Sequence, residues 1–402
     1  MTKTTRTLVI SHFFPPESMA GAHRWKQLIS ELPDDIECRV LCPPPAYPYG
    51  EFNQSSRLIK RETIDGISVT RLWTVQPETD SRADQSNLGR ILNYVIFSVL
   101  ASLYVIANCW RYDCVVTVSA PHTTFLPGAI GKLLGCLWVV DIFDLWLDNA
   151  TDMGYVESGT LAYRYIWVLE WLAITKSDAI TVIAETMAQS YVEKFEVSRE
   201  RFALVPFGVD EELFTPAPEQ THSTRVLYVG NMGDAHALRP FIEAFQQLPP
   251  TYMLEFIGDG KRRNELEALT SKLDLTDQIS FVGFVERTEV ASRLQQSALS
   301  IVPLQEDLQL DYARPNKLLE SMAVGTPYVA SDVREIQQVT DESGAGMVVS
   351  NDPDEIAAAI KKLVSDPEQR QKMGNSAVDY IDSHHRWPLL GERVTNLIRS
   401  VD

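Results

Sequence analysis

Short apolar runs alternate with longer amphipathic stretches along the whole chain. In the first half, the runs that we expect to form buried strands are residues 8–11, 38–42, 67–72, 115–118, 139–142 and 179–182. In the second half, runs of the same kind are residues 226–229, 252–257, 279–285, 298–304 and 327–332. Strands that alternate with helices predict parallel sheets covered by helices on both faces. The pattern therefore predicts an α/β protein made of two Rossmann-like halves.

Length and composition agree with two domains. The chain has 402 residues, of which 45% are hydrophobic, enough to supply two separate cores. A polar, proline-containing stretch at residues 207–218 follows a short strand expected at 204–206. We therefore expect a first domain at residues 1–208, a linker at 209–224 and a second domain at 225–374.

Charge and cysteine usage exclude some classes of function. The formal net charge of −18 disfavours binding to the phosphate backbone of nucleic acids. The cysteines are Cys38, Cys42, Cys109, Cys114 and Cys136. Their odd number and the lack of metal-ligand spacing predict reduced, mostly buried thiols in a cytosolic chain. The apolar run at residues 7–11 is too short for the core of a signal peptide, and we expect no essential metal or cofactor.

One short predicted helix combines clear boundaries with charges on one face. Pro315 suits the first helical position, and Gly325 followed by Pro327 is a typical stop. Lys317 in the first turn and Glu320 three residues later lie on the same face. A helix start and a lysine attract phosphate, whereas a carboxylate accepts hydrogen bonds from ribose hydroxyls. The segment predicts a sugar-nucleotide site; the alternative is a capped surface helix with an ion pair.

The same segment resembles the signature of the retaining glycosyltransferases of family 4. From Lys317 to Pro327 the chain follows the family's pattern K-x-x-E-x-M-A-x-G-x-P. The resemblance implies the GT-B fold, in which two Rossmann-like domains with parallel sheets face each other across a cleft. It also implies that a C-terminal helix, expected within residues 375–402, returns to the N-terminal domain. The resemblance is to members that assemble O-antigens and exopolysaccharides.

Further segments resemble the donor site of that family. Residues 226–233, 252–261 and 279–285 resemble the strands and turns around the nucleotide, and the loop at residues 12–24 resembles the family's F-P-P-x-x-G-G-x-x-x-R loop. The implied donor-binding residues are Gly21, Gly230, Asn231, Gly233, Gly258, Asp259, Gly260, Phe284, Arg314, Asn316, Lys317 and Glu320. The implied catalytic residues are Lys317, Glu320 and Asp144. Lys317 would stabilise the departing diphosphate by its positive charge.

Candidates for the acceptor side come from the first half of the chain. The implied residues are Arg24, His122 and Asp144. Asp144 follows an expected strand, where many family members place a residue that orients or deprotonates the acceptor hydroxyl. Asp141 and Asp148 compete for this role, and Asp144 could instead cap the next helix. The alternative for His122 is a structural histidine beside a strand end, and that for Arg24 is a solvated residue.

The chain departs from the family pattern at two places. Tyr312 stands where the family often has the first glutamate of a Glu-x7-Glu motif, so contacts to the donor sugar must come from other residues. Candidates for these contacts are Asp311, Arg314 and Asn316. Asn231 and His236 replace the basic residues that usually follow the first strand of the donor domain. Phosphate binding would then depend more on Lys317 and on backbone N–H groups.

Two apolar stretches raise the question of a membrane. Residues 91–110 carry no charged side chain and are about long enough to span a bilayer. We reject a span, because the next core strand, residues 115–118, belongs to the same expected sheet as the strands before it. The second stretch contains the aromatic residues Tyr163, Tyr165, Trp167 and Trp171. Both stretches are either core helices or helices that contact the inner membrane face peripherally.

The sequence thus predicts a cytoplasmic glycosyltransferase, peripheral at the inner membrane face. It would move a hexosyl or N-acetylhexosaminyl group with retention from a nucleotide sugar, UDP favoured, to a lipid-linked or glycan acceptor. One alternative is a non-hydrolysing sugar-nucleotide epimerase, which would need no acceptor. Another is an inactive subunit that only binds sugar nucleotides, which the tyrosine at position 312 keeps open.

Overall fold

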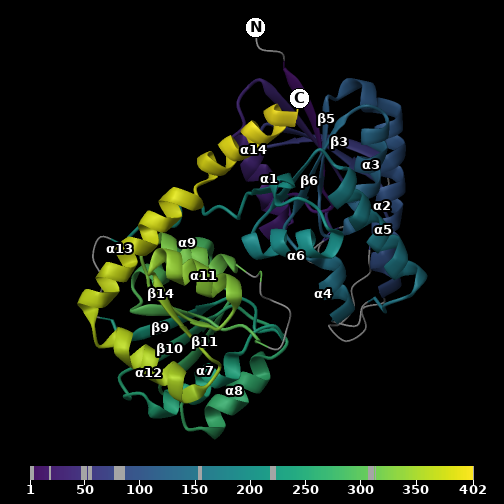
Figure 1. Ribbon diagram of the computed structural model, residues 1–402. Coiled ribbons are helices and arrows are strands. Elements are labelled where there is room, and N and C mark those ends of the chain that lie inside the picture. Colours follow the sequence, from purple (N-terminus) through teal and green to yellow (C-terminus); the bar gives the residue numbers. More distant parts are fainter. Residues whose placement is uncertain are drawn as a thin grey trace. The chain divides into compact units, whose positions relative to one another are not determined.

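The protein folds into two compact units, each described by itself. The computed structural model describes residues 4–17, 20–46, 52, 57–76, 87–152, 156–217, 223–306, 312 and 314–401. One unit comprises Met1–Pro206 together with Trp387–Asp402, and the other comprises Phe207–Arg386 (Figure 1). Each unit is built around one sheet whose strands alternate with helices, which confirms the predicted α/β class.

Among the described residues, the first unit contains an eight-stranded sheet in the order β3-β4-β2-β1-β5-β6-β7-β8. Its strands are β1 (Thr5–Ile10), β2 (Ile36–Cys42), β3 (Ile59–Ile64), β4 (Ile67–Leu72), β5 (Cys114–Val118), β6 (Leu137–Ile142), β7 (Ala179–Val182) and β8 (Phe202–Leu204). Neighbouring strands are parallel, apart from the antiparallel pair β3 and β4. The strand order reverses beside β1, and sheets of this kind bind ligands at such a point, outside the carboxyl ends of the strands.

The sequence pattern does not predict β3. This strand pairs with β4 through a turn at Asp65 and Gly66, which have φ values of 48° and 83°. A two-residue Asp-Gly turn with positive φ at both positions matches the twist of an antiparallel hairpin. β3 is mostly exposed and carries Lys60-Arg61-Glu62 at its centre, so it lacks an apolar run.

Helices cover both faces of this sheet. They are α1 (Ala20–Ser30), α2 (Asn87–Asn108), α3 (Phe125–Leu133), α4 (Trp146–Asp152), α5 (Leu161–Lys176), α6 (Glu185–Phe195) and α14 (Trp387–Val401). Side chains alternate between the two faces of a strand, so Val9 packs with Trp25 of α1 and Leu390 of α14. The preceding Leu8 packs with Phe97 of α2 on the opposite face. In Figure 1, α1 and α14 accordingly lie on one side of the sheet, and α2 and α3 on the other.

The second unit contains a parallel sheet in the order β11-β10-β9-β12-β13-β14. Its strands are β9 (Arg225–Val229), β10 (Met253–Ile257), β11 (Ile279–Gly283), β12 (Leu299–Val302), β13 (Tyr328–Ser331) and β14 (Gly346–Val349). Its helices are α7 (Leu238–Ala244), α8 (Arg263–Lys272), α9 (Arg287–Gln295), α10 (Asn316–Ala323), α11 (Arg334–Ser343), α12 (Pro353–Val364) and α13 (Pro367–His384). Val226 packs with Phe241 of α7, whereas Leu227 packs on the opposite face with Leu318 of α10.

The segment expected as a linker, residues 209–224, is in part core. Val209 and Phe214 are buried in the second unit, and the Val209 N–H donates to the His385 carbonyl at 2.9 Å. The expectation of a linker from residue 209 is therefore corrected, because these apolar side chains attach the segment to the second core. Residues 218–222 lie outside the described part of the chain.

The C-terminal segment is divided between the two units. α13 buries Ala377 and Ile381 in the core of the second unit, whereas α14 buries Leu390 against α1 of the first. The predicted return from residue 375 is corrected to a start at Trp387. The physical reason is that α13 carries an apolar face of its own, which the second core takes up.

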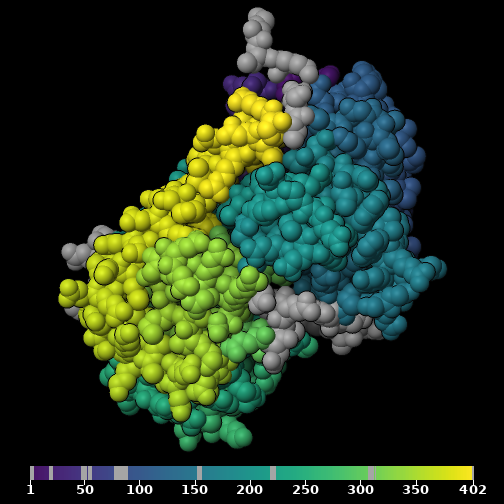
Figure 2. Space-filling view, in the orientation of Figure 1, coloured from purple at the N-terminus to yellow at the C-terminus, as the bar shows by residue number. Residues whose placement is uncertain are grey.

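α2 is buried on one side and exposed on the other. Phe97, Ala101 and Val105 pack against the sheet. The exposed apolar residues of α2 are Ile91, Leu92, Val95, Val99, Leu103 and Ile106. Within the described residues, Gly89–Arg111 is the one helix with the length and composition to cross a membrane, yet α2 connects β4 and β5 of a single sheet. In Figure 2 the blue atoms of the first unit, which the bar places near residue 100, form part of the visible surface at the upper right.

Candidate functional site

Three glycine turns meet at the carboxyl ends of β9, β10 and β11. Gly230, Gly258 and Gly283 have φ values of 142°, 116° and 88°, which residues with a side chain rarely adopt. The Gly230 N–H donates to the Ile257 carbonyl at 2.9 Å, and the Gly258 N–H donates to the Gly283 carbonyl at 2.8 Å. A Cβ on Gly258 would overlap the Gly230 carbonyl oxygen. The glycines thus let three backbone segments approach closely at the edge where parallel sheets bind ligands.

Lys317 reaches this edge from α10. Its ammonium donates to the Tyr228 hydroxyl at 3.1 Å and lies 4.3 Å from the centre of the Tyr228 ring. The Tyr228 hydroxyl donates in turn to the Asn231 carbonyl at 2.6 Å, which fixes the turn after β9. A Cβ on Gly230 would lie only 2.9 Å from Lys317 Nζ. The ammonium and the glycine turn are therefore adjacent, an arrangement suited to phosphate.

α10 starts one residue later than the sequence predicts. Pro315 is the N-cap, with φ −65° and ψ 141°, and Asn316 is the first helical residue. The extended ψ of Pro315 keeps it outside the helix, which corrects its expected place. The predicted stop is present, since the helix ends at Ala323 and Gly325 takes a φ of 78°.

Burial changes the charge of the groups around Lys317. It lowers the pKa of Lys317 to about 7, against the opposing effect of Glu320. Burial and the charge of Lys317 together lower the pKa of His236 to about 3, so this imidazole is neutral at neutral pH. A bound anion would favour the charged ammonium, because an opposite charge stabilises the protonated form of lysine.

Glu320 lies on the same face of α10 as Lys317, with 12% of its side chain exposed. Its Oε1 accepts a hydrogen bond from Arg287 Nη2 at 2.9 Å. Burial raises the pKa of Glu320, and the guanidinium of Arg287 opposes this effect. Arg287 also lies over the Phe214 ring, 5.3 Å from its centre. The carboxylate is thus held in place by an ion pair within the second unit.

Several other predicted donor residues gather at the same edge. The Asn231 side chain is enclosed by Gly233 and Gly260, since a Cβ on either glycine would lie 2.9 Å or 2.5 Å from its amide atoms. The Asp259 carboxylate turns back and accepts from the Gly260 N–H at 2.6 Å. Phe284 directly follows β11 and is 82% exposed, so its ring face is accessible for stacking.

The candidates for contacts to the donor sugar do not all lie at this edge. Arg314 forms a buried ion pair with Glu335, and its Nη1 lies 3.1 Å from His385 Nε2. This places the guanidinium among side chains of the second unit. Asn316 opens α10 one position before Lys317, whereas Asp311 lies outside the described residues.

In the first unit, the predicted acceptor residue Arg24 is fully buried. Its Nε and Nη2 donate to the Asp141 carboxylate at 2.9 Å each. Nη2 also donates to the Val205 carbonyl at 2.7 Å, and Nη1 donates to the Pro206 carbonyl at 2.9 Å. Trp25 Nε1 also donates to Asp141, at 2.8 Å. The structure thus places Arg24 and Asp141 together in a core ion pair that joins α1 to β6 and to the segment after β8.

Gly21 lies within α1 and close to the end of β6. A Cβ at this position would lie 2.8 Å from the ring of Phe143, so the glycine allows the helix to pack there. Residues 18–19 of the same loop lie outside the described part of the chain. Gly21 is therefore explained by packing in this unit.

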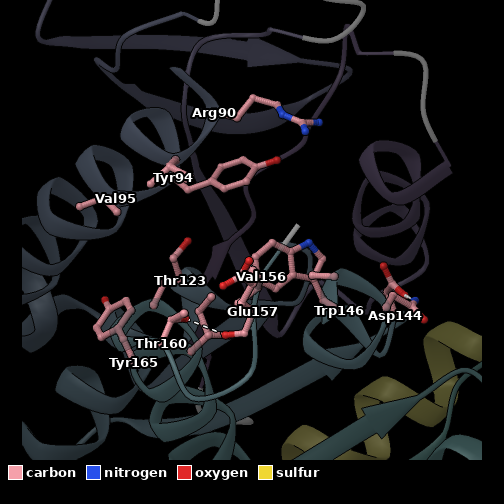
Figure 3. Close-up of a pocket in the computed structure, with 15 residues that line it drawn as sticks. Arg90, Tyr94, Val95, Thr123, Asp144, Trp146, Val156, Glu157, Thr160 and Tyr165 are labelled. Atoms are coloured by element: carbon pink, nitrogen blue, oxygen red, sulfur yellow. Dashed lines mark hydrogen bonds between the residues drawn. The ribbon is translucent and has the colours of Figure 1, made fainter. Parts of the chain in front are cut away.

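Asp144 lines an apolar pocket of about 680 Å³ in the first unit (Figure 3). Its Oδ1 accepts from Asn149 Nδ2 at 2.6 Å. The walls come from α2, α4 and α5 and include Val95, Trp146 and Tyr165. A pocket of this size and lining is typical of sites for small molecules. Of the three competing aspartates, Asp144 is the one that lines this pocket.

The two remaining candidates of this region, Asp148 and His122, belong to a charge network around buried Glu170. Lys194 donates to Asp148 and Glu170 at 2.9 Å each, and the Tyr191 hydroxyl donates to Glu170 at 3.1 Å. His122 Nδ1 lies 3.8 Å from Glu170 Oε1, and burial followed by the charge of Lys194 lowers the pKa of His122 to about 3. The network joins α4 and α5, two of the helices that line the pocket, to α6.

The sequence reasoning did not single out Tyr228, Arg287 or the Lys194–Glu170 pair. Tyr228 occupies an ordinary inward position of an apolar strand, and Arg287 opens a helix that carries no motif. Lys194 and Glu170 lie on different helices. These contacts form only when segments that are distant in the sequence pack together. The spacing of residues within one segment therefore does not predict them.

The cysteines are as the sequence predicts, and all five are free. Burial raises the pKa of Cys38 and of Cys42 to about 12, so both are protonated thiols at neutral pH. Over the described residues, no group of three or more His, Cys, Asp or Glu side chains is placed to hold a metal ion.

Two family models match the chain, one in each half. The model described as "Glycosyl transferase 4-like domain" matches residues 20–208, and that described as "Glycosyl transferases group 1" matches residues 209–379. Together they extend over most of both units.

Individual relatives are more distant. The GDP-mannose-dependent monoacylated alpha-(1-6)-phosphatidylinositol monomannoside mannosyltransferase of Corynebacterium glutamicum is 23% identical over 250 residues, which cover 56% of this chain and 63% of the relative. The match thus spans less than two thirds of that enzyme. The probable glycosyltransferase WbjE of Pseudomonas aeruginosa is 24% identical over 314 residues, 72% of this chain and 77% of WbjE.

The fold is shared with solved structures. Anabaena HepE in complex with UDP superposes with a TM-score of 0.70 at 14% identity, over 98% of this chain and 100% of that one. With both halves matched by glycosyltransferase models, the chain belongs to the family 4 type of glycosyltransferases with the GT-B fold.

Proposed function

We propose that the protein transfers a sugar, with retention, from a nucleotide sugar to a lipid-linked acceptor. The observation that carries this proposal is the position of Lys317, whose ammonium lies beside the Gly230 turn, with Glu320 on the same helix face. A departing diphosphate is stabilised by positive charge that is already in position. The acid and the cation on one helix suit the two ends of a nucleoside diphosphate.

We favour UDP as the nucleotide and a hexosyl or N-acetylhexosaminyl group as the sugar. HepE, which shares the fold, has been solved in complex with UDP. The mannosyltransferase of C. glutamicum is by name dependent on GDP-mannose, so GDP is the alternative that the first experiment must distinguish. Phe284 would stack on the base, and Glu320 would accept hydrogen bonds from the ribose.

Two residues have proposed roles in the transfer. Lys317 would stabilise the negative charge that grows on the leaving phosphate oxygen. Asp144, at the wall of the apolar pocket, would orient or deprotonate the acceptor hydroxyl. The proposal includes no essential metal, and full activity in the presence of EDTA is the expected result.

We also propose that the protein works at the inner membrane face. Leu103 and Ile106 of α2 are 56% and 53% exposed, and Leu161 and Val168 are exposed on α5. A soluble protein seldom exposes apolar residues in such groups without a partner. A half-exposed apolar helix suits the boundary between head groups and acyl chains, where it lies in the plane of the membrane.

The two alternatives differ in what they leave unexplained. A non-hydrolysing epimerase converts the donor alone and has no use for an apolar pocket beside Asp144. An inactive binding subunit is compatible with Tyr312 in place of the usual glutamate, and would bind nucleotide without transfer. The apolar pocket and the exposed face of α2 favour an enzyme that takes a lipid-linked acceptor.

The first experiment is a thermal-shift panel with UDP, GDP, dTDP and their sugar conjugates. Ligands that bind the folded state raise the midpoint of unfolding, so a shift selective for uridine nucleotides is expected. Transfer from the selected donor to lipid-linked acceptors is then measured. The absence of a shift with every nucleotide would contradict the proposal, and a shift without transfer to any acceptor would favour the inactive subunit.

A further inference from the structure

The pocket of the first unit is lined mainly by apolar side chains. An acceptor made only of sugars would need hydrogen-bond partners there. Its walls include Ile91 and Val95 of α2, Trp146 and Ala150 of α4, and Ile166 of α5. Burial of apolar surface in such a cavity favours a hydrocarbon ligand. Sugars present hydroxyl groups on all sides, and a buried hydroxyl without a partner is costly.

The charged side chains of the pocket, Arg90, Asp144 and Glu157, lie apart from one another around its wall. In Figure 3, Arg90 and Tyr94 extend from α2 along one side, Glu157 and Thr160 lie across from them, and Asp144 lies at a third position beyond Trp146. A phosphate pairs well with a guanidinium and is repelled by carboxylates. The position for a phosphate is therefore next to Arg90, away from the two acids.

The pocket is continuous with the exposed apolar face of the first unit. Ile91 and Val95 line the pocket and are also 52% and 40% exposed on α2. Tyr165 of α5 likewise lines the pocket and is partly exposed on the surface. A hydrocarbon chain that leaves a bilayer at this face could enter the pocket without crossing a polar surface.

We infer that this pocket binds the hydrocarbon chain of the acceptor where it joins its phosphate, with the phosphate paired to Arg90. The inference rests on the proposed function and makes it narrower, because it names a single-chain lipid phosphate as the acceptor class. The size of the pocket, about 680 Å³, fits one small-molecule-sized segment of chain.

The test uses farnesyl phosphate below its micelle concentration as the probe, with the full chain and isothermal titration calorimetry. Ala162 lines the pocket and is exposed, so Ala162→Trp fills the pocket without adding volume to the core. Leu161→Trp is the matched control, because Leu161 is the preceding residue of α5, is 84% exposed and does not line the pocket. We expect at least a tenfold loss of affinity for the first variant and less than a twofold change for the second.

The phosphate and the chain are tested separately. Arg90→Gln should weaken farnesyl phosphate about tenfold and leave farnesol unchanged, because only the phosphate carries charge. Dodecyl phosphate distinguishes a straight chain from an isoprenoid one, and tighter binding of either identifies the source. Equal affinity of the wild type and Ala162→Trp for both lipid phosphates, or no binding of either, would overturn the inference.

The outcome can be separated from failure of the proposed function. If UDP raises the unfolding midpoint while neither lipid phosphate binds, the donor assignment stands and the lipid pocket is wrong. If a lipid phosphate binds in an Ala162-dependent way while no nucleotide binds, the pocket stands and the transferase proposal is wrong. The unfolding midpoints of both tryptophan variants, measured without ligand and compared with that of the wild type, check that they fold.

Discussion

In the second unit, the carboxyl edge of the sheet is made of glycine turns, and one lysine is directed at them. In the first unit, the charged groups of the same region are turned inward. Arg24 pairs with Asp141 in the core, and Lys194 pairs with buried Glu170, so the accessible pocket is left mainly apolar. The carboxyl edge of the second sheet thus presents a cation beside glycine turns, whereas that of the first sheet presents a mainly apolar pocket.

The difference suits the ligands that we propose for the two edges. A diphosphate is a compact anion, and a cation beside a glycine turn suits it. A hydrocarbon chain offers no directional contact, so its site must be a cavity shaped by side chains. The first edge therefore depends on packing between helices, whereas the second depends on backbone geometry.

The largest expected effect is that of Lys317→Ala. Removal of the ammonium should lower kcat by roughly 10²- to 10³-fold, the range seen when one group that stabilises developing charge is lost. The UDP-induced thermal shift should fall as well. Lys272→Ala is the matched control, because Lys272 is an exposed lysine in the last turn of α8, outside the segments that resemble the donor site. Equal activity of the two variants would mean that the second edge does not depend on this cation.

The glycine turns give the second prediction. Gly258→Ala should lower the free energy of unfolding by about 3 kcal/mol, since the residue has φ 116° and its Cβ would overlap the Gly230 carbonyl. Gly344 also has a positive φ, 62°, but a Cβ at this position would meet nothing within 4 Å. Gly344→Ala should therefore lower the free energy of unfolding by only about 1 kcal/mol. Urea denaturation measures both. Similar losses would show that close backbone approach is not what the second edge requires.

Asp144→Asn tests the first edge. The amide retains an oxygen that can accept from Asn149, so the local contact is kept while the base is lost. We expect kcat to fall roughly 10²-fold with the donor-induced thermal shift unchanged. A role as a structural cap would instead leave kcat intact, or lower the unfolding midpoint and kcat together.

The parts of the molecule that the sequence predicts are those with a local signature. The run from Lys317 to Pro327 identifies α10, its stop and the charged face, because spacing along one helix determines them. The partners Tyr228 and Arg287 were not predictable, since they reach α10 from other elements. For the same reason the sequence shows an apolar α2 but not the pocket, whose walls come from three helices.

The smallest expected effect is a dependence of donor binding on pH. Burial lowers the pKa of Lys317 to about 7, so the ammonium is mostly charged below pH 7 and mostly neutral above it. A diphosphate binds the charged form, so affinity for the donor sugar nucleotide should fall as pH rises above 7, by at most tenfold per pH unit. Binding above pH 7 should take up a proton, which calorimetry in buffers of different ionisation enthalpy detects.

Lys317→Arg separates this effect from other titrations. A guanidinium remains charged throughout the range, so donor affinity in this variant should be independent of pH between 6.5 and 8.5, roughly. The donor sugar nucleotide is preferred to UDP as the probe, because a terminal phosphate itself titrates near pH 6. His236 does not confound the result, since its pKa of about 3 keeps it neutral over this range. If the wild type were as independent of pH as the arginine variant, Lys317 would already be fully charged without ligand, and burial would not govern the second edge.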